Sequence, residues 1–428
     1  MKNVNILVFP CGSEIGLEIH RALSFSKFIT LFGGSSVQSN HGKYVYERYI
    51  ENLSHVDEPD FIEKLNSVIK KYDIDYVFPA HDSVVLKLAE NQNDLHCKVI
   101  GSSFETCELT RSKKKTYEFF EDKIETPTVY SHSSEVNNFP VFLKPDIGQG
   151  AKGTVLANST EEIEFYLKKD PTLLILENLP GEEYTIDCFT DKSGKLKFVG
   201  VRERTRISNG ISVNSKMIKE DNEFRKIAEA INSSITFRGV WFFQLKRSKD
   251  NKLSLLEISA RVAGAMGYFR NMGVNLPLLS IFDLMGYDVE INLNNYSMEM
   301  DRSLVSRFSL DIEYDNVYID FDDTLVCNGK VNVILVSFIY ECINNNKKIF
   351  LLTRHQYNIQ DSLSKYKLST LFDDIYHLKN REPKSNYINS QNSIFIDDSY
   401  AERIEVSSKL NIPTFDLDSV ESLISIKR

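Results

Sequence analysis

The sequence has only six cysteines, and none of them form a Cys-x-x-Cys pair. Scattered thiols of this kind are typical of a reduced cytoplasmic protein and argue against a disulfide framework. Long apolar runs are also lacking, because the longest, around residues 331–343, is interrupted by polar and charged residues. That run is too short and too broken to cross a bilayer, and no signal peptide precedes the first apolar strand. We therefore expect a cytoplasmic protein that has no membrane partner.

An excess of basic residues is lacking as well, since the formal net charge is -9. A sequence-independent nucleic-acid binder needs a basic face, so this class of function is excluded. Nucleotides remain possible ligands, because they require only a few local lysines and arginines. The chain of 428 residues is too long for one hydrophobic core and indicates two or three domains.

The first hundred residues have the pattern of a parallel α/β domain, which we place at residues 1–105. An apolar strand at residues 5–9 leads into a glycine turn and an amphipathic helix. The turn is not a dinucleotide fingerprint, because Glu14 stands where the second glycine would be. His81 and Asp82 follow a later strand, so they are candidate contacts for a non-nucleotide substrate or simply a capped turn.

A glycine-rich loop stands at the centre of the chain. The strand beginning at Val141 ends in Lys144, and the loop that follows contains Gly148, Gly150 and Gly153. Glycines at this spacing leave backbone N–H groups accessible to a phosphate chain, and Lys144 and Lys152 would supply positive charge. An ordinary hairpin turn is the alternative interpretation of the same residues.

Two basic stretches flank this loop in the sequence. Residues 113–115 are three adjacent lysines, of which at most one or two can face a common site, so a solvated patch is the alternative. Arg202, Arg204 and Arg206 alternate along a strand and share one face. Like charges in such a row are unfavourable unless anionic groups lie opposite, although a surface strand with solvated arginines is also open.

A predicted hairpin formed by residues 239–246 and 253–261 carries the strongest site pattern in this half. Period-two alternation places Glu257, Ser259 and Arg261 on the same face of its second strand. A carboxylate and a hydroxyl offer oxygen ligands to Mg²⁺, and a guanidinium can bind a phosphoryl group.

Taken in order, these motifs resemble the ATP-grasp superfamily, in particular the large subunit of carbamoyl phosphate synthetase and biotin carboxylase. The resemblance covers residues 1–309 and implies a two-lobed grasp fold at residues 106–312. It implies that ATP phosphates bind Lys113 and Lys144, and that Glu177, Leu179 and Glu183 line the adenine and ribose. Gln244 and Glu257 would hold Mg²⁺, with Mn²⁺ as an alternative, and Arg261 would stabilise the transferring phosphoryl group. Ser259 stands where family members usually have asparagine, which leaves a second metal site in question.

The last hundred residues contain three strands of parallel type that each end in polar side chains. Asp320, Asp322 and Asp323 follow the first strand, Thr353 ends the second, and Asp397 and Asp398 end the third. Lys384 begins a helix between the last two. Strands of this kind bring their carboxyl ends to one edge of a sheet, where clustered carboxylates require a cation.

This second set resembles the haloacid dehalogenase superfamily of phosphohydrolases, at residues 317–428. The resemblance implies that Asp320 is the nucleophile and Asp322 the general acid/base. Thr353 and Lys384 would hold the phosphoryl oxygens, and Asp320, Asp322, Asp397 and Asp398 would form the magnesium site. The intervals between the motifs leave no room for a large cap domain.

The sequence therefore predicts an α/β and α+β chain with a parallel pre-grasp domain, an ATP-grasp domain and a Rossmann-like C-terminal domain. We expect a bifunctional enzyme that joins a small carboxylate to an amine with ATP and Mg²⁺, and that also hydrolyses a phosphorylated substrate. Carbamoyl phosphate synthesis and an ATP-binding module that regulates the phosphatase are the alternatives. A homodimer is one expected assembly, and His81, Asp82, Arg204 and Arg206 are the expected substrate contacts.

Overall fold

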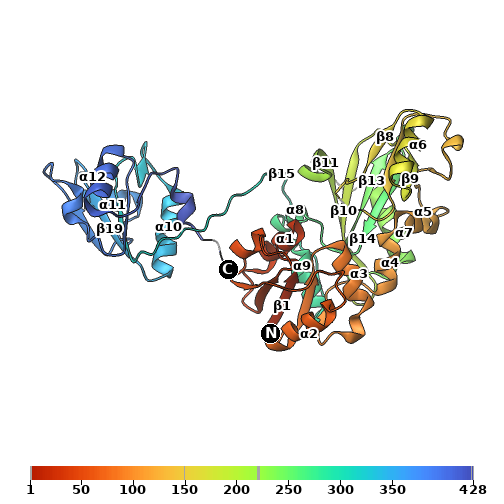
Figure 1. The fold of residues 1–428 in the computed structure, drawn as a ribbon, viewed down its shortest axis with the longest axis horizontal. Coiled ribbons are helices and arrows are strands. Elements are labelled where there is room, and N and C mark those ends of the chain that lie inside the picture. The colour runs from red at the N-terminus through yellow and green to blue at the C-terminus, as the bar shows by residue number, and fades with distance from the viewer. Residues whose placement is uncertain (1, 149, 219–221, 426, 428) are drawn as a thin grey trace. The chain divides into compact units, whose positions relative to one another are not determined.

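The computed structural model describes residues 2–148, 150–218, 222–425 and 427 (Figure 1). The chain divides into two compact units, one ending at Leu304 and one covering Val305–Lys427. Within the described ranges, no helix is long and apolar enough to cross a membrane. Residues 302–314 form neither helix nor strand.

The first unit begins with a parallel five-stranded sheet of order β3-β2-β1-β4-β5. Its strands are β1 (Val4–Phe9), β2 (Ile29–Gly34), β3 (Arg48–Ile50), β4 (Tyr76–Pro79) and β5 (Lys98–Val99). Its helices are α1 (Glu14–Leu23), α2 (Phe61–Lys71) and α3 (Asp82–Glu90). The strand order reverses between β1 and β4, which opens a crevice beyond their carboxyl ends.

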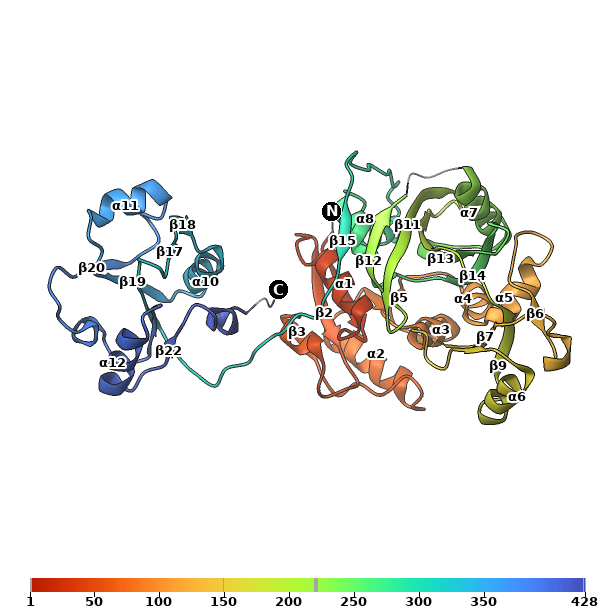
Figure 2. The ribbon, with the colours of Figure 1, turned by 90° about the horizontal axis from the view of Figure 1, so that it is seen from above.

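A four-stranded antiparallel sheet of order β6-β9-β7-β8 follows. It consists of β6 (Val129–Tyr130), β7 (Val141–Pro145), β8 (Val155–Ala157) and β9 (Leu173–Glu177), and α6 (Thr160–Lys169) lies beside β9 in both views (Figures 1 and 2). The Ser159 hydroxyl accepts a hydrogen bond from the Glu162 N–H and so caps the start of α6. The glycine-rich loop connects β7 to β8.

The largest sheet of this unit has the order β14-β13-β10-β11-β12-β15 and is antiparallel. Its strands are β10 (Glu183–Thr190), β11 (Leu196–Ser208), β12 (Ile211–Met217), β13 (Gly239–Arg247), β14 (Leu253–Ser259) and β15 (Glu299–Asp301). The accompanying helices are α4 (Phe104–Arg111), α5 (Lys113–Phe120), α7 (Asn222–Ser234), α8 (Gly267–Asn271) and α9 (Leu276–Leu284). One hydrophobic core joins this sheet to the first one, because Ile6 and Val8 are clustered with Phe242 and Phe269.

The second unit is built on a parallel five-stranded sheet of order β20-β19-β16-β21-β22. The strands are β16 (Asn316–Ile319), β19 (Lys348–Thr353), β20 (Asp374–His377), β21 (Ser393–Ile396) and β22 (Thr414–Phe415). The helices are α10 (Val333–Asn344), α11 (Ile359–Tyr366) and α12 (Tyr400–Leu410), and a short hairpin is formed by β17 (Val326–Cys327) and β18 (Lys330–Val331). The reversal of strand order beside β16 gathers the ends of β16, β19 and β21 at one edge.

Candidate functional site

The first unit contains a cavity of about 260 Å³ that the small sheet and the largest sheet line together. One part of its wall is apolar, and another part carries lysines and loop glycines. This division suits a ligand with a flat apolar end and an anionic chain. The predicted nucleotide-binding residues in its lining are Lys113, Lys144, Gly148, Gly150, Lys152, Glu177, Leu179 and Glu183. Gly153 is not among the lining residues, and its φ of +75° belongs to the turn of the loop.

Lys144 is the most deeply buried lysine of this cavity. Its Nζ donates to the Leu256 carbonyl at 3.1 Å and lies 5.4 Å from the centre of the Tyr117 ring. Burial lowers the pKa of Lys144 to about 7, although Glu257 opposes the shift. Lys113 donates to the Asp146 carbonyl at 3.1 Å, and burial lowers its pKa as well. An anionic ligand would restore the full charge of both lysines.

The two neighbouring lysines point elsewhere. Lys115 forms an ion pair with Glu108 at 2.8 Å, and Lys114 lies 4.0 Å from Glu118. Of the three adjacent lysines, the cavity lining therefore includes only Lys113 among the described residues. The alternative of a solvated patch holds for the other two.

The glycine loop closes against the turn between β11 and β12. Asn209 and Gly210 both have positive φ, at 50° and 75°, as a tight hairpin turn requires. A Cβ at Gly210 would lie 2.4 Å from the backbone of Gly150, so a side chain there would force the two loops apart. Arg111 donates to the Gly148 carbonyl at 3.1 Å and fixes the other end of the loop.

Cross-strand register aligns four side chains in one row on the largest sheet. Arg202 is paired with Thr185, Thr185 with Gln244, and Gln244 with Glu257. Gln244 and Glu257 therefore face the same space as predicted, and both line the cavity. The side-chain amide oxygen of Gln244 accepts a hydrogen bond from Arg204 at 2.8 Å. Arg204 also forms an ion pair with Glu183 at 2.6 Å.

The row of arginines on β11 is balanced by acidic residues of the chain itself. Arg202 forms a buried two-bond pair with Asp187, at 2.7 and 3.2 Å. Arg206 pairs with Asp301 at 2.8 Å where both side chains are exposed. At these two positions, side chains of this chain therefore supply the anionic groups that the row of arginines requires.

The other two residues of the predicted metal and phosphate face turn toward Asp82. Ser259 donates its hydroxyl to Asp82 at 3.1 Å, and Arg261 donates two bonds at 2.7 and 2.8 Å. Burial alone would raise the pKa of Asp82, but Arg261 lowers it to about 2. This contact ties β14 to the start of α3.

A second cavity of about 220 Å³ lies in the crevice beyond β1 and β4. It shares Gly150, Arg204, Gly210, Gln244 and Glu257 with the first cavity, so the two spaces meet at the glycine loop and the sheet row. Of the predicted substrate contacts, the lining includes His81, Asp82 and Arg204 but not the exposed Arg206.

Glu14 and Arg302 are among the residues of this cavity that were not predicted. Arg302 lies 3.3 Å from Glu14 and also donates to the Ser212 carbonyl at 3.1 Å. Glu14 directly follows the turn after the first strand, which is a signal that the sequence offers. Arg302 comes from the far end of the unit and carries no comparable signal.

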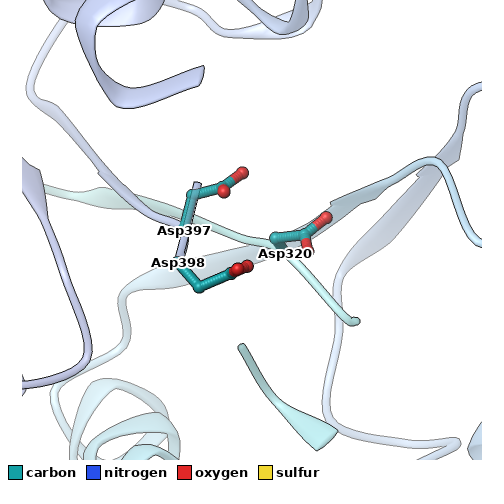
Figure 3. A group of neighbouring side chains, drawn as sticks. All are labelled: Asp320, Asp397 and Asp398. Atoms are coloured by element: carbon teal, nitrogen blue, oxygen red, sulfur yellow. The ribbon is translucent and has the colours of Figure 1, made fainter. Parts of the chain in front are cut away.

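The second unit has its own polar cluster at the carboxyl edge of its sheet. Asp320, Asp397 and Asp398 each offer an oxygen, and these atoms lie within 4.8 Å of one another (Figure 3). The Lys384 ammonium lies between two of these residues, 2.7 Å from Asp320 and 2.6 Å from Asp397. These four predicted residues are therefore brought together.

Asp320, Asp397 and Lys384 are buried, Asp398 is half-buried, and the carboxylates outnumber the ammonium. Burial raises the pKa of Asp320 to about 7, with Lys384 opposing the shift and Asp397 adding to it. Burial also raises the pKa of Asp397. For Lys384, burial would lower the pKa, but the two carboxylates raise it. Three carboxylates around one ammonium suit a divalent cation with oxygen ligands.

The other two predicted residues of this unit, Thr353 and Asp322, both contact His355. Thr353 is buried at the end of β19, where its hydroxyl accepts from the His355 N–H at 3.2 Å. Asp322 contacts the His355 ring. Two residues that were not predicted have clear contacts, since His355 meets Asp322 and Thr324 donates to Asp398 at 2.9 Å. Both stand within two residues of a predicted one.

Comparison with known proteins agrees with the fold of the first unit. Residues 169–302 match the family model described as ATP-grasp in the biosynthetic pathway with Ter operon. D-alanine–D-alanine ligase of Fusobacterium nucleatum is 29% identical over 229 residues, which are 51% of this chain and 78% of that protein.

Solved structures give the same result. Biotin carboxylase of Campylobacter jejuni, in its β-γ-ATP complex, matches with a TM-score of 0.56 and 14% identity, covering 67% of this chain and 72% of that chain. L-amino acid ligase of Bacillus licheniformis matches with a TM-score of 0.52 and 18% identity, covering 66% and 75%. The first unit therefore has the ATP-grasp fold that the motif order predicts.

Proposed function

We propose that the first unit, with its ATP-grasp fold, is an ATP- and Mg²⁺-dependent ligase that joins a carboxylate to an amine through an acyl phosphate. The observation that carries this proposal is the meeting of two cavities at Gln244 and Glu257. A nucleotide in the first cavity and a carboxylate in the second would approach each other at that point. Holding two bound reactants next to each other in the right orientation lowers the barrier to the reaction between them.

In this proposal the apolar wall and Leu179 receive the adenine, and Glu177 and Glu183 receive the ribose. Lys113, Lys144, Lys152 and the glycine loop hold the phosphates. Glu257 and Gln244 would hold Mg²⁺, which neutralises charge on the phosphoryl oxygens. Ser259 is bonded to Asp82, so it contributes to such a site only if that bond is exchanged.

Arg261 has the role of stabilising the transferring phosphoryl group in the same proposal. Its guanidinium lines the second cavity while Asp82 occupies two of its donors. A guanidinium fixed in this way is oriented before the substrate arrives, which avoids reorganisation during the transfer. Attack of the amine on the acyl phosphate then releases phosphate.

The test is ADP formation by the full chain with pooled amino acids and small acids. Release of ADP that requires both a carboxylate and an amine supports the ligase. Tight ATP binding without acceptor-dependent turnover supports instead the alternative of a regulatory module. Turnover with bicarbonate and an ammonia source, but with no larger acid, supports the carbamoyl phosphate alternative.

For the second unit we propose a Mg²⁺-dependent phosphohydrolase of the haloacid dehalogenase type. The supporting observation is the buried ammonium of Lys384 between Asp320 and Asp397. Asp320 attacks the phosphorus, and the bond to the leaving oxygen breaks as Asp322 donates a proton to that oxygen. Water then attacks the aspartyl phosphate and gives its proton to Asp322, which releases phosphate and restores Asp320. Thr353 and Lys384 hold the phosphoryl oxygens. Asp320, Asp397 and Asp398 would hold Mg²⁺, which would supply charge neutralisation, whereas the predicted metal ligand Asp322 is not part of this group and its carboxylate contacts His355. Phosphate release from phenyl phosphates, abolished in Asp320→Asn, tests this assignment.

A further inference from the structure

Asp322 is the most exposed carboxylate of the second-unit site, yet its side chain is held in one place. Its side chain is 53% exposed, whereas the His355 side chain that contacts it is only 9% exposed. The Nδ1 atom of His355 lies 2.9 Å from one carboxylate oxygen of Asp322 and 3.0 Å from the other. A buried ring thus fixes a carboxylate that solvent would otherwise leave free to rotate.

His355 is itself fixed by three further contacts. Its Nε2 lies 2.7 Å from the hydroxyl of Ser362 on α11. The Phe321 ring meets it edge-on with ring centres 4.8 Å apart, and Tyr357 lies at 5.6 Å on a similar geometry. The ring therefore has one defined orientation, which both nitrogens and the packing select.

The backbone of His355 belongs to the same active-site loop. Its N–H donates to the Thr353 hydroxyl at 3.2 Å, and its carbonyl lies 2.6 Å from Nε2 of His377. Thr353 is a proposed phosphoryl-oxygen contact, and Asp322 the proposed proton-transfer group. His355 thus connects the two by one short segment of chain.

We propose that His355 is the positioning residue for the general acid/base Asp322, an assignment that rests on the proposed phosphohydrolase function. A neutral imidazole is sufficient, because Nδ1–H can donate to the carboxylate while Nε2 accepts from Ser362. The benefit is orientational, since the carboxyl group must lie within hydrogen-bond reach of the leaving oxygen.

The test uses the full chain with Mg²⁺ and a series of substituted phenyl phosphates. These substrates share a phenol leaving group and differ in its pKa. kcat/KM reports the step in which the leaving group departs. His355→Ala should lower kcat/KM for phenyl phosphate by about 10- to 100-fold, which is only part of the roughly 10²–10⁴-fold contribution of general acid catalysis, because Asp322 is still present but no longer held in place. For p-nitrophenyl phosphate, which hardly needs protonation, the loss should be less than about threefold. The dependence on leaving-group pKa therefore becomes steeper.

Two further variants separate positioning from a merely structural role. His355→Asn keeps a donor near the Nδ1 position and should recover most of the lost activity toward phenyl phosphate. In an Asp322→Asn background, His355→Ala should add no further loss, because residues that act through one another are not additive. Ser362→Ala should give a smaller change in the same direction, and it serves as the test if His355→Ala does not fold.

Equal losses for all leaving groups, or a full additional loss in the Asp322→Asn background, would overturn the role of His355. If the unaltered chain releases no phosphate in an Asp320-dependent manner, the phosphohydrolase proposal itself fails and the inference fails with it. The two failures are distinguishable because the second is seen before any change at His355.

Discussion

Two buried lysines, one in each unit, have pKa values displaced in opposite directions. Lys144 is 7% exposed, bonds to a backbone carbonyl, and has its pKa lowered by burial to about 7. Lys384 is 3% exposed and touches Asp320 and Asp397, which raise its pKa against the effect of burial. Equal burial of the same side chain thus gives different charge states, according to the nearest carboxylates.

The charges around these two lysines indicate which kind of ligand each site binds. The ammonium groups of Lys144 and Lys113 donate to backbone carbonyls and not to carboxylates, so both can still bind an incoming anion. Around Lys384 the carboxylates outnumber the ammonium, so the electrostatic attraction favours an incoming cation. This contrast fits a nucleotide in one unit and a metal-dependent phosphoester in the other.

The largest expected effect separates the two sites by one substitution in each. Asp320→Asn should lower phosphate release from a phosphomonoester by at least about 10³-fold and leave ATP-dependent turnover unchanged, because the nucleophile is lost. Glu257→Gln should do the reverse, since it removes a carboxylate proposed to hold Mg²⁺ beside ATP. Parallel assays of ADP and phosphate release check both. If either change silenced both activities in a folded protein, the contrast between the units would not describe two centres.

A smaller effect is expected when the first lysine loses its charge. Lys144→Met should weaken binding of an ATP analogue by about 10- to 100-fold, because a buried charge-assisted contact to phosphate is removed. Isothermal titration of the full chain measures this. Lys114→Met is the matched control, since Lys114 is exposed and lies near Glu118 on the same helix. Equal weakening by the two changes would mean that the burial of Lys144 has no role in binding.

The pH dependence of stability tests the charge imbalance around Lys384. The folded pKa of Asp320 is raised to about 7, so between about pH 4 and 7 the native state binds more protons than the unfolded chain. Stability from this group is therefore lost as pH rises through that window. Without Mg²⁺, Asp320→Asn should make the amides of β21 exchange more slowly than in the unaltered chain at pH 8, and the difference should shrink toward pH 4.

Added Mg²⁺ provides the control for this experiment. At pH 8 the ion should slow exchange in the unaltered chain and have less effect on Asp320→Asn, because a ligand is missing. A variant that is less stable at pH 8 and gains stability relative to the unaltered chain as pH falls would contradict the charge imbalance around Lys384.

The smallest effect is expected at the exposed ion pair of β11. Arg206→Ala should change the free energy of unfolding by less than about 1 kcal/mol, because the Arg206–Asp301 pair is open to solvent. It should also leave both activities unchanged. Arg202→Ala, which leaves Asp187 buried without its partner, should cost about 3–5 kcal/mol by comparison. Thermal unfolding of the two variants measures the difference.

Much of the arrangement follows from local sequence. Polar side chains at the ends of apolar strands predict the cluster at Asp320 and Asp397, because parallel strands end at one edge. Period-two alternation likewise predicts that Glu257 faces a site, and the register with Gln244 agrees. The capping and turn chemistry at Ser159 and Asn209 is equally local.

The sequence does not specify which polar and charged side chains pair with other residues of the chain and which remain available to a ligand. Ser259 and Arg261 have the alternation of ligand-binding residues, yet both bond to Asp82, which lies in the first α/β region. That contact depends on how two sheets pack over their common core, and no local pattern encodes it. Arg206 is similarly paired with a residue of β15.

The most direct measurement is a crystal structure of the full chain with a nonhydrolysable ATP analogue, Mg²⁺ and beryllium fluoride. We expect the phosphates of the analogue to lie between Lys144 and Glu257. We also expect beryllium fluoride to bind the Asp320 carboxylate beside a metal ion. A nucleotide bound elsewhere, or a fluoride complex absent from Asp320 at saturating concentration, would contradict the claim of two separate phosphoryl-transfer centres.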